Sequence, residues 1–325
     1  MLETVACDYC GTSECITVAK QTDKLHQTTE EVFTIVRCAA CGLHYTNPRP
    51  SVNEIGRYYA EDYSFHATSS KNRRFALRIA EDLANGYFAS ILDAIPALGR
   101  RFAPYVKPCI FDPVRTYYFT GGKGAFLDIG CGSGVTAHFW GESGALLAYR
   151  QLTEVAGIEV AASARERLAS FDIEAWAGLD AVPTQRRFGM IRMNWSLEHV
   201  HSPSQYFSFL RERLLPGGRV VIAIPNYDGQ IYRLAPDCVE LPIHLYHFRP
   251  RDIENYASRN GLRIVGLRTF SYPQMYVYAT QVGLFPASFP KQLGLRAARA
   301  FQLTLDLFDQ AGWGNDMIVE LALNE

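Results

Sequence analysis

The sequence predicts an α/β protein in which helices flank a mostly parallel sheet, preceded by a small cysteine-bearing module. Three observations support this prediction. From residue 125 onward, short apolar runs alternate with helical segments. A glycine-rich turn follows the first of these runs, and two C-x-x-C pairs lie within the first 41 residues. A chain of 325 residues has room for about two domains or for one large domain with an appendage.

Composition excludes several classes of protein. Hydrophobic residues make up 48% of the chain and charged residues 20%, as in ordinary globular proteins. The net charge of -1 gives no field that would attract a nucleic-acid backbone or an anionic membrane. No apolar run reaches the roughly 18 residues that a membrane span needs, and the start at Met1 lacks the features of a signal peptide. We therefore expect a cytoplasmic protein.

The chain divides into three expected parts. Residues 1–50 form the cysteine module, because the proline-bearing segment 47–50 marks a boundary that a helix does not cross comfortably. Residues 51–123 form a mostly helical connector that contributes to the substrate pocket, with an amphipathic helix over 75–95. Residues 124–325 form the α/β domain.

Within this domain, the alternation predicts strands over 125–129, 155–160, 190–193, 219–224 and 262–269, and a closing strand over 316–323. A helix begins at Ser202-Pro203, where Gln205 completes a capping box, and Leu215-Pro216-Gly217-Gly218 ends it. Another helix is expected over 293–308.

The stretch Gly124-Ala-Phe-Leu-Asp-Ile-Gly-Cys-Gly-Ser-Gly134 is a buried strand followed by alternate glycines, a pattern that brings backbone close to a ligand. A dinucleotide fingerprint needs a third glycine at position 135, but this residue is Val135, which disfavours a dehydrogenase. A purely structural turn is the alternative. The second strand ends in Glu159, whose carboxylate can accept two hydrogen bonds from a ribose diol.

These residues resemble the class I S-adenosylmethionine-dependent methyltransferases, which have a Rossmann-like sheet with an antiparallel closing strand. The segment 127–134 matches the first motif of that family, and Glu159 matches the acidic end of its second strand. Residues 188–203 are similar to the fourth-strand segment and residues 214–225 to the entry into the fifth strand. The resemblance covers residues 124–325.

The resemblance implies S-adenosyl-L-methionine as cofactor. Asp128 and the loop glycines would hold its amino-acid end, Glu159 its ribose, and Leu179 would lie near its adenine. The cofactor-binding residues expected on this basis are Asp128, Gly130, Gly132, Gly134, Glu159, Leu179 and Asn194.

Cys7, Cys10, Cys38 and Cys41 present four thiolates as two knuckles, a pattern typical of tetrahedral zinc, although buried free thiols are the alternative. Four cysteines close the coordination shell, so we expect a structural zinc ion in a zinc-ribbon-like module. Cys15 is left over as a packed thiol. The run 38–50 with the following tyrosines resembles the zinc-bearing part of a methyltransferase subgroup that includes sugar C-methyltransferases.

Methyl acceptors are usually weak nucleophiles, so a group that takes the acceptor's proton is needed. His244 follows the fifth strand, in a segment that resembles the histidine-bearing substrate loop of that subgroup, and is the preferred general base. His199, after the fourth strand, is the second choice. The alternative for His244 is an ordinary loop histidine packed between aromatic residues. The alternative for His199 is a residue that orders the loop and the start of the following helix. Tyr59, Tyr63 and His66 would line the cleft without a catalytic role.

We therefore expect a methyltransferase that acts on a small-molecule acceptor, such as a sugar nucleotide or a biosynthetic intermediate, with histidine-assisted deprotonation. The alternative is a methyltransferase acting on RNA or protein, with the zinc module as recognition element. The neutral charge and the lack of a basic stripe count against RNA. Neither the acceptor atom nor the oligomeric state follows from the sequence.

Overall fold

The protein is represented by a computed structural model, in which the described residues are 2–59, 113–134, 146–271, 275–276, 279–280, 282–284 and 295–324. The helix expected over 75–95, most of the expected connector, and the cleft residues Tyr63 and His66 lie outside these ranges.

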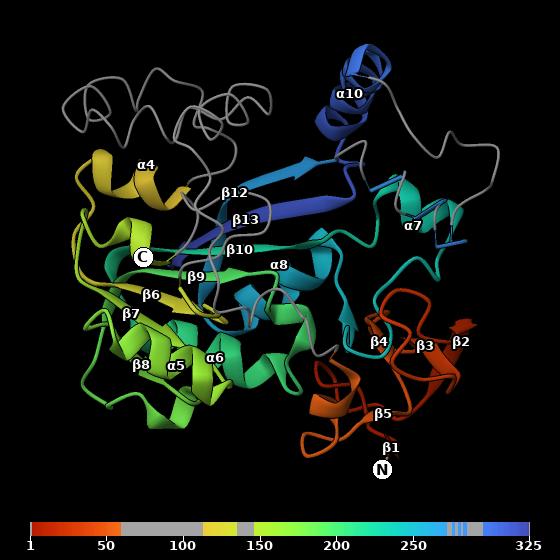
Figure 1. Cartoon of the computed structure of the whole chain (residues 1–325), viewed down its shortest axis with the longest axis horizontal. Helices are drawn as coiled ribbons and strands as arrows, with labels where there is room; N and C mark the ends of the chain where they lie inside the picture. Colours follow the sequence, from red (N-terminus) through yellow and green to blue (C-terminus); the bar gives the residue numbers. More distant parts are fainter. Residues whose placement is uncertain are drawn as a thin grey trace.

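A seven-stranded sheet forms the larger part of the molecule (Figure 1). Its strand order is β12-β13-β10-β9-β6-β7-β8. The strands from β10 to β8 run parallel, whereas β13 lies antiparallel to both β10 and β12. The strands are β6 (Phe126–Ile129), β7 (Val155–Ile158), β8 (Glu174–Trp176), β9 (Phe188–Asn194), β10 (Leu214–Pro225), β12 (Leu262–Phe270) and β13 (Asp316–Leu323). The predicted fold class is thereby confirmed.

All six predicted strands are present, and the differences from the prediction are local. The short strand β8 was not predicted, because its three residues are too few to show an alternating pattern. Strand β10 begins at Leu214, five residues earlier than expected, and its pairing with β9 shifts register between Leu214 and Arg219. A bulge of this kind lets the Pro-Gly-Gly segment remain within the strand.

The central strands are buried on both faces, as expected for parallel strands covered by helices. In β6, Leu127 and Ile129 belong to the core that also contains residues of α6 and α8, while Phe126 belongs to the core on the opposite face. This alternation follows from the two-residue period of a strand. It also places Asp128 on the same face as Phe126.

Short helices connect the strands. They are η1 (Ile55–Tyr58), α4 (Pro113–Phe119), η4 (Leu146–Tyr149), α5 (Ala162–Ala169), η5 (Leu179–Ala181), η6 (Leu197–His199), α6 (Pro203–Arg213), α7 (Gln230–Leu234), α8 (Pro250–Arg259) and α10 (Leu295–Gln310). The helix expected over 293–308 corresponds to α10. No helix in the described ranges is long and apolar enough to cross a bilayer.

The N-terminal module has a sheet of its own, which the C-terminal part of the chain completes. The module contributes β2 (Cys15–Gln21), β3 (Phe33–Cys38) and β4 (His44–Thr46), and β1 (Leu2–Glu3) pairs with β5 (Arg49–Pro50). The fourth strand of this sheet is β11 (Tyr246–His247), which runs antiparallel to β4. The segment that carries His244 is therefore fixed to the module immediately before β11.

The module is also bonded to the start of α6. The carboxylate of Asp8, between Cys7 and Cys10, accepts hydrogen bonds from the Ser204 backbone N–H at 2.8 Å and from the Ser202 hydroxyl at 2.8 Å. It also accepts one from the Tyr256 hydroxyl at 2.8 Å. Ser202 makes no side-chain capping bond of its own, so the predicted capping box is wrong. A carboxylate from a distant part of the chain supplies the acceptor that a helix N-terminus requires.

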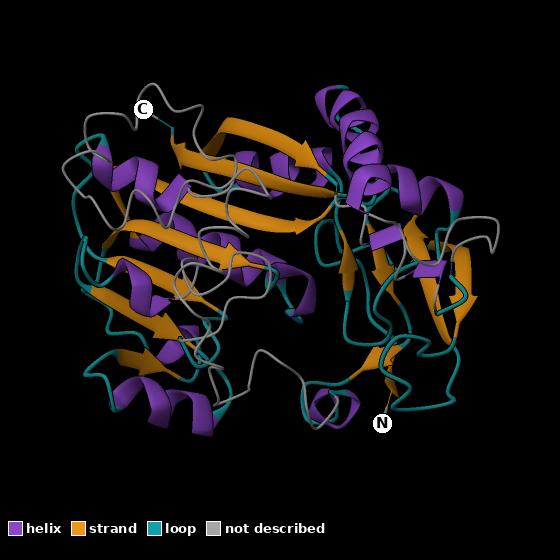
Figure 2. Cartoon of the chain, turned by 45° about the horizontal axis from the view of Figure 1, so that its top comes forward, coloured by secondary structure: helices purple, strands orange, loops and turns teal. Residues whose placement is uncertain are grey.

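These contacts place the module beside one end of the large sheet. Figures 1 and 2 both show the carboxyl ends of the parallel strands facing the module. Ligands of open α/β sheets bind at this edge. The turn after β6, the end of β7 and the segment after β9 thus lie on the side of the sheet toward the module.

Candidate functional site

The turn after β6 is built from glycines in a left-handed backbone conformation. Gly130, Gly132 and Gly134 have φ angles of 77°, 55° and 72°. A Cβ atom at Gly130 would lie 2.6 Å from the Cβ atom of Ser196, and one at Gly134 would lie 2.3 Å from Leu168 Cδ2. The left-handed conformation favours glycine at both positions, and Gly130 is also needed for space. The loop therefore packs directly against the segment that follows β9.

Glu159 ties this loop to the end of β7. One carboxylate oxygen accepts the Gly132 backbone N–H at 2.8 Å and the other accepts the Ala161 backbone N–H at 2.9 Å. The residue is only 5% exposed. These two contacts fix the orientation of the carboxylate. The predicted ribose ligand thus lies at the carboxyl edge of the sheet, against the glycine loop.

Asp128 is held inside the sheet by an arginine. Both of its carboxylate oxygens accept hydrogen bonds from Arg192 on β9, at 2.9 Å and 2.6 Å, and the two side chains are 4% and 8% exposed. Arg192 also donates to the Tyr149 hydroxyl at 3.2 Å and lies over the Phe126 ring. The observed contacts of Asp128 are those of a buried ion pair, and its contact with the amino-acid end of a cofactor stays a prediction.

Leu179 and Asn194 also lie at this edge. Leu179 begins η5, just beyond β8, and is partly buried against the core. Asn194 is the last residue of β9 and is half-buried. The next residue, Trp195, has a φ angle of 49°, and such strained backbone is costly for a residue with a side chain. The structure brings the predicted cofactor residues to one edge, but their contacts with a cofactor stay predictions.

The four predicted zinc ligands converge in the module. The Cys7 and Cys41 sulfurs are 3.5 Å apart, the Cys10 and Cys38 sulfurs are 3.4 Å apart, and all four lie within 4.8 Å of one another. Four sulfurs at Zn–S bonds of about 2.3 Å would lie roughly 3.8 Å apart. The donor set and its spacing therefore fit a tetrahedral ion. Cys15 is exposed and outside this cluster, so the expectation that it is a packed thiol is wrong.

The two candidate catalytic histidines meet at the junction between the sheet and the module. Their rings lie 4.6 Å apart, centroid to centroid, at nearly a right angle. His199 belongs to η6, three residues after the Ser196 that contacts the glycine loop, and Ser196 Oγ donates to the Ile129 carbonyl at 2.9 Å. The segment of His244 is bonded to η6 through the Leu245 N–H and the Glu198 carbonyl, at 2.8 Å.

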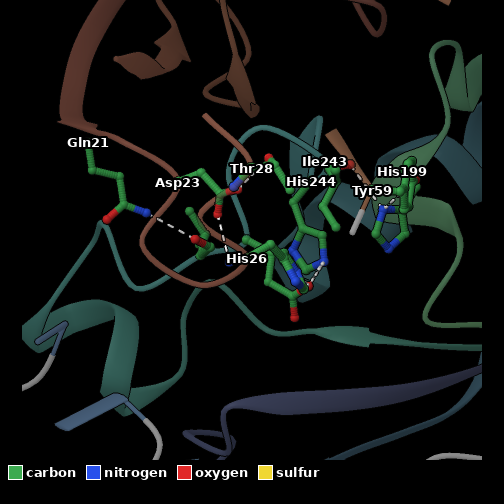
Figure 3. A network of polar contacts seen from close by, with 10 residues as sticks. Gln21, Asp23, His26, Thr28, Tyr59, His199, Ile243 and His244 are labelled. Carbon is green, nitrogen blue, oxygen red and sulfur yellow. Dashed lines mark hydrogen bonds and ion pairs between the residues drawn. The ribbon is translucent and has the colours of Figure 1, made fainter. Parts of the chain in front are cut away.

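A polar network surrounds this pair (Figure 3). His199 Nδ1 lies 3.0 Å from the Ile243 carbonyl and 3.3 Å from the Tyr59 hydroxyl. On the other side of His244, Glu240 Oε2 lies 3.9 Å from His244 Nε2 and 3.0 Å from His26 Nε2. Glu240 therefore stands between a histidine of the module and the preferred base.

Burial determines the charge states in this network. It lowers the pKa of His244 to about 4, although Glu240 acts in the opposite direction, and burial with the neighbouring His244 lowers the pKa of His199 to about 3. Burial alone would raise the pKa of Glu240, but the adjacent His244 and His26 outweigh it and bring the value to about 2. At neutral pH both central imidazoles are uncharged, and each has a nitrogen able to accept a proton.

Sequence reasoning missed three of these residues. Arg192 is a charged residue inside an apolar strand, a pattern that signals a buried partner. Glu240 lies four residues before His244, a spacing that could have suggested the contact. His26 comes from a loop more than 200 residues away, and no local pattern connects it to Glu240.

The sequence matches one family of known proteins. A family model described as a methyltransferase domain matches residues 78–267, which is more than half of the chain. No curated protein matches the sequence.

Several solved structures resemble the fold at low sequence identity. One is a complex between the Haloferax volcanii Trm112 methyltransferase activator and a putative methyltransferase, with 13% identity, a TM-score of 0.43, and coverage of 62% of this chain and 82% of that one. A putative sarcosine dimethylglycine methyltransferase from Galdieria sulphuraria has 14% identity, a TM-score of 0.41, and coverage of 62% and 78%. An O-methyltransferase of a Brevibacillus brevis trans-AT PKS multienzyme, in complex with S-adenosyl-L-homocysteine, has 15% identity, a TM-score of 0.41, and coverage of 76% and 80%.

Proposed function

Because the chain belongs to the methyltransferase domain family and is an S-adenosylmethionine-dependent methyltransferase, we propose that it methylates a small-molecule acceptor with help from a histidine. A sugar nucleotide or another biosynthetic intermediate is the acceptor class that the sequence resemblance favours. The main support for the proposal is the position of His244 and His199, which lie next to the segment packed against the glycine loop.

The residues at the sheet edge fit the cofactor. The left-handed glycines bring backbone close to a ligand, and Glu159 is buried and pre-oriented by two backbone N–H groups. We assign the ribose to Glu159, the amino-acid end to Asp128 with Gly130, Gly132 and Gly134, and the adenine side to Leu179. When bound, S-adenosyl-L-methionine supplies an activated methyl group on a sulfonium centre.

His244 is the preferred group for removing the acceptor's proton. It is neutral at physiological pH because burial lowers the pKa of its ring, so a ring nitrogen can accept a proton. Glu240, 3.9 Å from Nε2, would stabilise the imidazolium that forms. His199, turned toward His244 and anchored at the Ile243 carbonyl, is the second choice.

The cysteine cluster is assigned a structural zinc ion. Four thiolates leave no position open for water, so the ion would stabilise the module and take no part in transfer. This stabilisation affects the site in two ways. Asp8, which lies between two of the cysteines, caps α6. Strand β4 of the module pairs with β11. The module would thus hold the His244 segment in place.

Methylation of RNA or protein, with the module as recognition element, remains the second candidate. The two functions are separated by supplying methyl-labelled S-adenosyl-L-methionine to an extract and fractionating the products. Label in the small-molecule fraction, absent with the Glu159→Ala variant, is the result we expect. Label in the RNA or protein fraction would overturn the proposed acceptor class.

A further inference from the structure

Three potential metal-binding side chains converge beside the two histidines, outside the cysteine cluster. Ligand atoms of Glu198, His199 and His244 lie within 4.8 Å of one another. Glu198 is 1% exposed and His244 7% exposed. Glu198 and His199 are adjacent in η6, and the Leu245 N–H to Glu198 carbonyl bond fixes the His244 segment against them.

Glu198 is the unusual member of this cluster. Both of its carboxylate oxygens are buried, and neither has a hydrogen-bond partner among the residues that the structure describes. A buried polar group without a partner costs roughly 1–3 kcal/mol, and such groups are rare in folded proteins. Protonation removes the charge but adds a donor that also needs a partner. The arrangement therefore calls for a bound group that contacts these oxygens.

One of the two histidine rings, that of His199, is held in the way that metal ligands usually are. His199 Nδ1 lies 3.0 Å from the Ile243 carbonyl, and Glu240 Oε2 lies 3.9 Å from His244 Nε2. The carbonyl acceptor behind His199 fixes the orientation and tautomer of that ring and makes its other nitrogen a better electron donor. Glu240 lies beyond hydrogen-bonding distance of His244 and acts on that ring through its charge. Each ring thus retains one nitrogen for a ligand.

From this arrangement we propose that Glu198, His199 and His244 form a second metal site, which binds a divalent first-row transition-metal ion. Two imidazoles and one carboxylate suit ions such as Fe²⁺, Co²⁺ and Zn²⁺, and a set of three leaves coordination positions open. The site differs in this respect from the four-thiolate cluster, whose shell is closed.

This inference refines the proposed function, because it changes how the histidines assist deprotonation. With an ion bound, His244 is a ligand, and an acceptor hydroxyl coordinated at an open position would lose its proton to solvent at a lower pH. Ion binding itself can be measured without any acceptor. A failure of the metal proposal is therefore distinct from a failure of the methyl-transfer proposal.

The test is a titration of the full-length protein with Co²⁺ after removal of bound metal, followed by absorption spectroscopy and metal analysis. A four-thiolate site gives intense thiolate-to-cobalt charge-transfer bands, whereas a site of two histidines and a glutamate gives only weaker ligand-field bands. We expect two equivalents of Co²⁺ per chain, one of each spectral type. If the cysteine cluster alone fails to bind, one equivalent without charge-transfer bands still supports the proposal.

Variants assign the second equivalent. Glu198→Gln and His244→Ala should each lose the equivalent that lacks charge-transfer bands and retain the thiolate bands, which also report that the module is folded. His201→Gln is the matched control, because His201 contacts the Pro50 carbonyl and lies outside the cluster. It should bind two equivalents. Binding by wild-type protein at the cysteines alone, or retention of the second equivalent in both variants, would overturn the proposal.

Discussion

Two buried carboxylates on neighbouring parts of the sheet have opposite surroundings. Asp128, on β6, is 3% exposed and accepts two hydrogen bonds from Arg192. Glu198, just after β9, is 1% exposed, and its oxygens have no hydrogen-bond partner within the described ranges. Both residues stand next to motifs that sequence reasoning linked to function. Their surroundings distinguish them: Asp128 completes the fold through its ion pair, whereas Glu198 is arranged for a ligand.

The difference follows from the cost of burying charge. In a buried ion pair with good geometry, the attraction between the two charges offsets the cost of removing them from water. Removing one member therefore leaves the other as an uncompensated buried charge. Burial raises the pKa of Glu198 well above its ordinary value, and its carboxyl group already carries the cost of an unpartnered buried polar group in the native state. Asp128 is therefore expected to matter for stability, and Glu198 for binding.

The largest expected effect is that of Asp128→Leu, which leaves Arg192 buried without a counter-charge. We expect a loss of about 3–5 kcal/mol in the free energy of unfolding, measured by urea denaturation. The double variant with Arg192→Leu should regain most of the lost stability, because neither member of the ion pair then remains as a buried charge. If the free energy of unfolding of the Asp128→Leu variant is within about 1 kcal/mol of the wild-type value, the distinction between the two carboxylates does not hold.

A smaller effect is expected for Glu159, a carboxylate that is both bonded and oriented for a ligand. Glu159→Ala should weaken S-adenosyl-L-homocysteine binding by about 1.5–3 kcal/mol, or roughly ten- to a hundredfold in Kd, through lost hydrogen bonds to a charged group. Calorimetric titration measures this value, and thermal melting controls for loss of the Gly132 and Ala161 contacts. An unchanged Kd would sink the ribose assignment.

The smallest expected effect on stability is that of Glu198→Leu, the counterpart of Asp128→Leu. In protein dialysed free of added metal, this substitution removes a polar group that lacks a partner. We expect the free energy of unfolding to change by no more than about 1 kcal/mol in either direction. Urea denaturation of both leucine variants, side by side, gives the comparison. A loss as large as that of Asp128→Leu would mean that Glu198 has a structural partner.

Sequence patterns predicted the parts of the molecule that depend on neighbours in the chain. Six of the seven strands of the large sheet, the glycine turn at Gly130 and the cysteine knuckles follow from short-range spacing of residue types. In contrast, β11 has only two residues and exists because β4, some 200 positions away, offers an edge for pairing. No local pattern encodes such a strand.

Sequence patterns also predicted only part of the candidate site. His199 and His244 were chosen for their places after strands, and the structure brings them into contact. Their supporting residues were not found, because these come from elsewhere: Glu240 from the preceding turn and His26 from the module. The Asp8 cap on α6 was missed for the same reason, and local serines were credited with it instead. Side-chain contacts across long sequence separations depend on the fold as a whole.

The most direct test of the account compares wild-type protein with His244→Ala, using labelled S-adenosyl-L-methionine and the acceptor fraction identified from extract. Two quantities are measured: the Kd for S-adenosyl-L-homocysteine and the rate of methyl transfer at saturating cofactor. We predict an unchanged Kd and a transfer rate lower by about 10²-fold or more, because the variant loses deprotonation of the acceptor but keeps the cofactor edge. Transfer at the wild-type rate would contradict the role given to the histidine cluster.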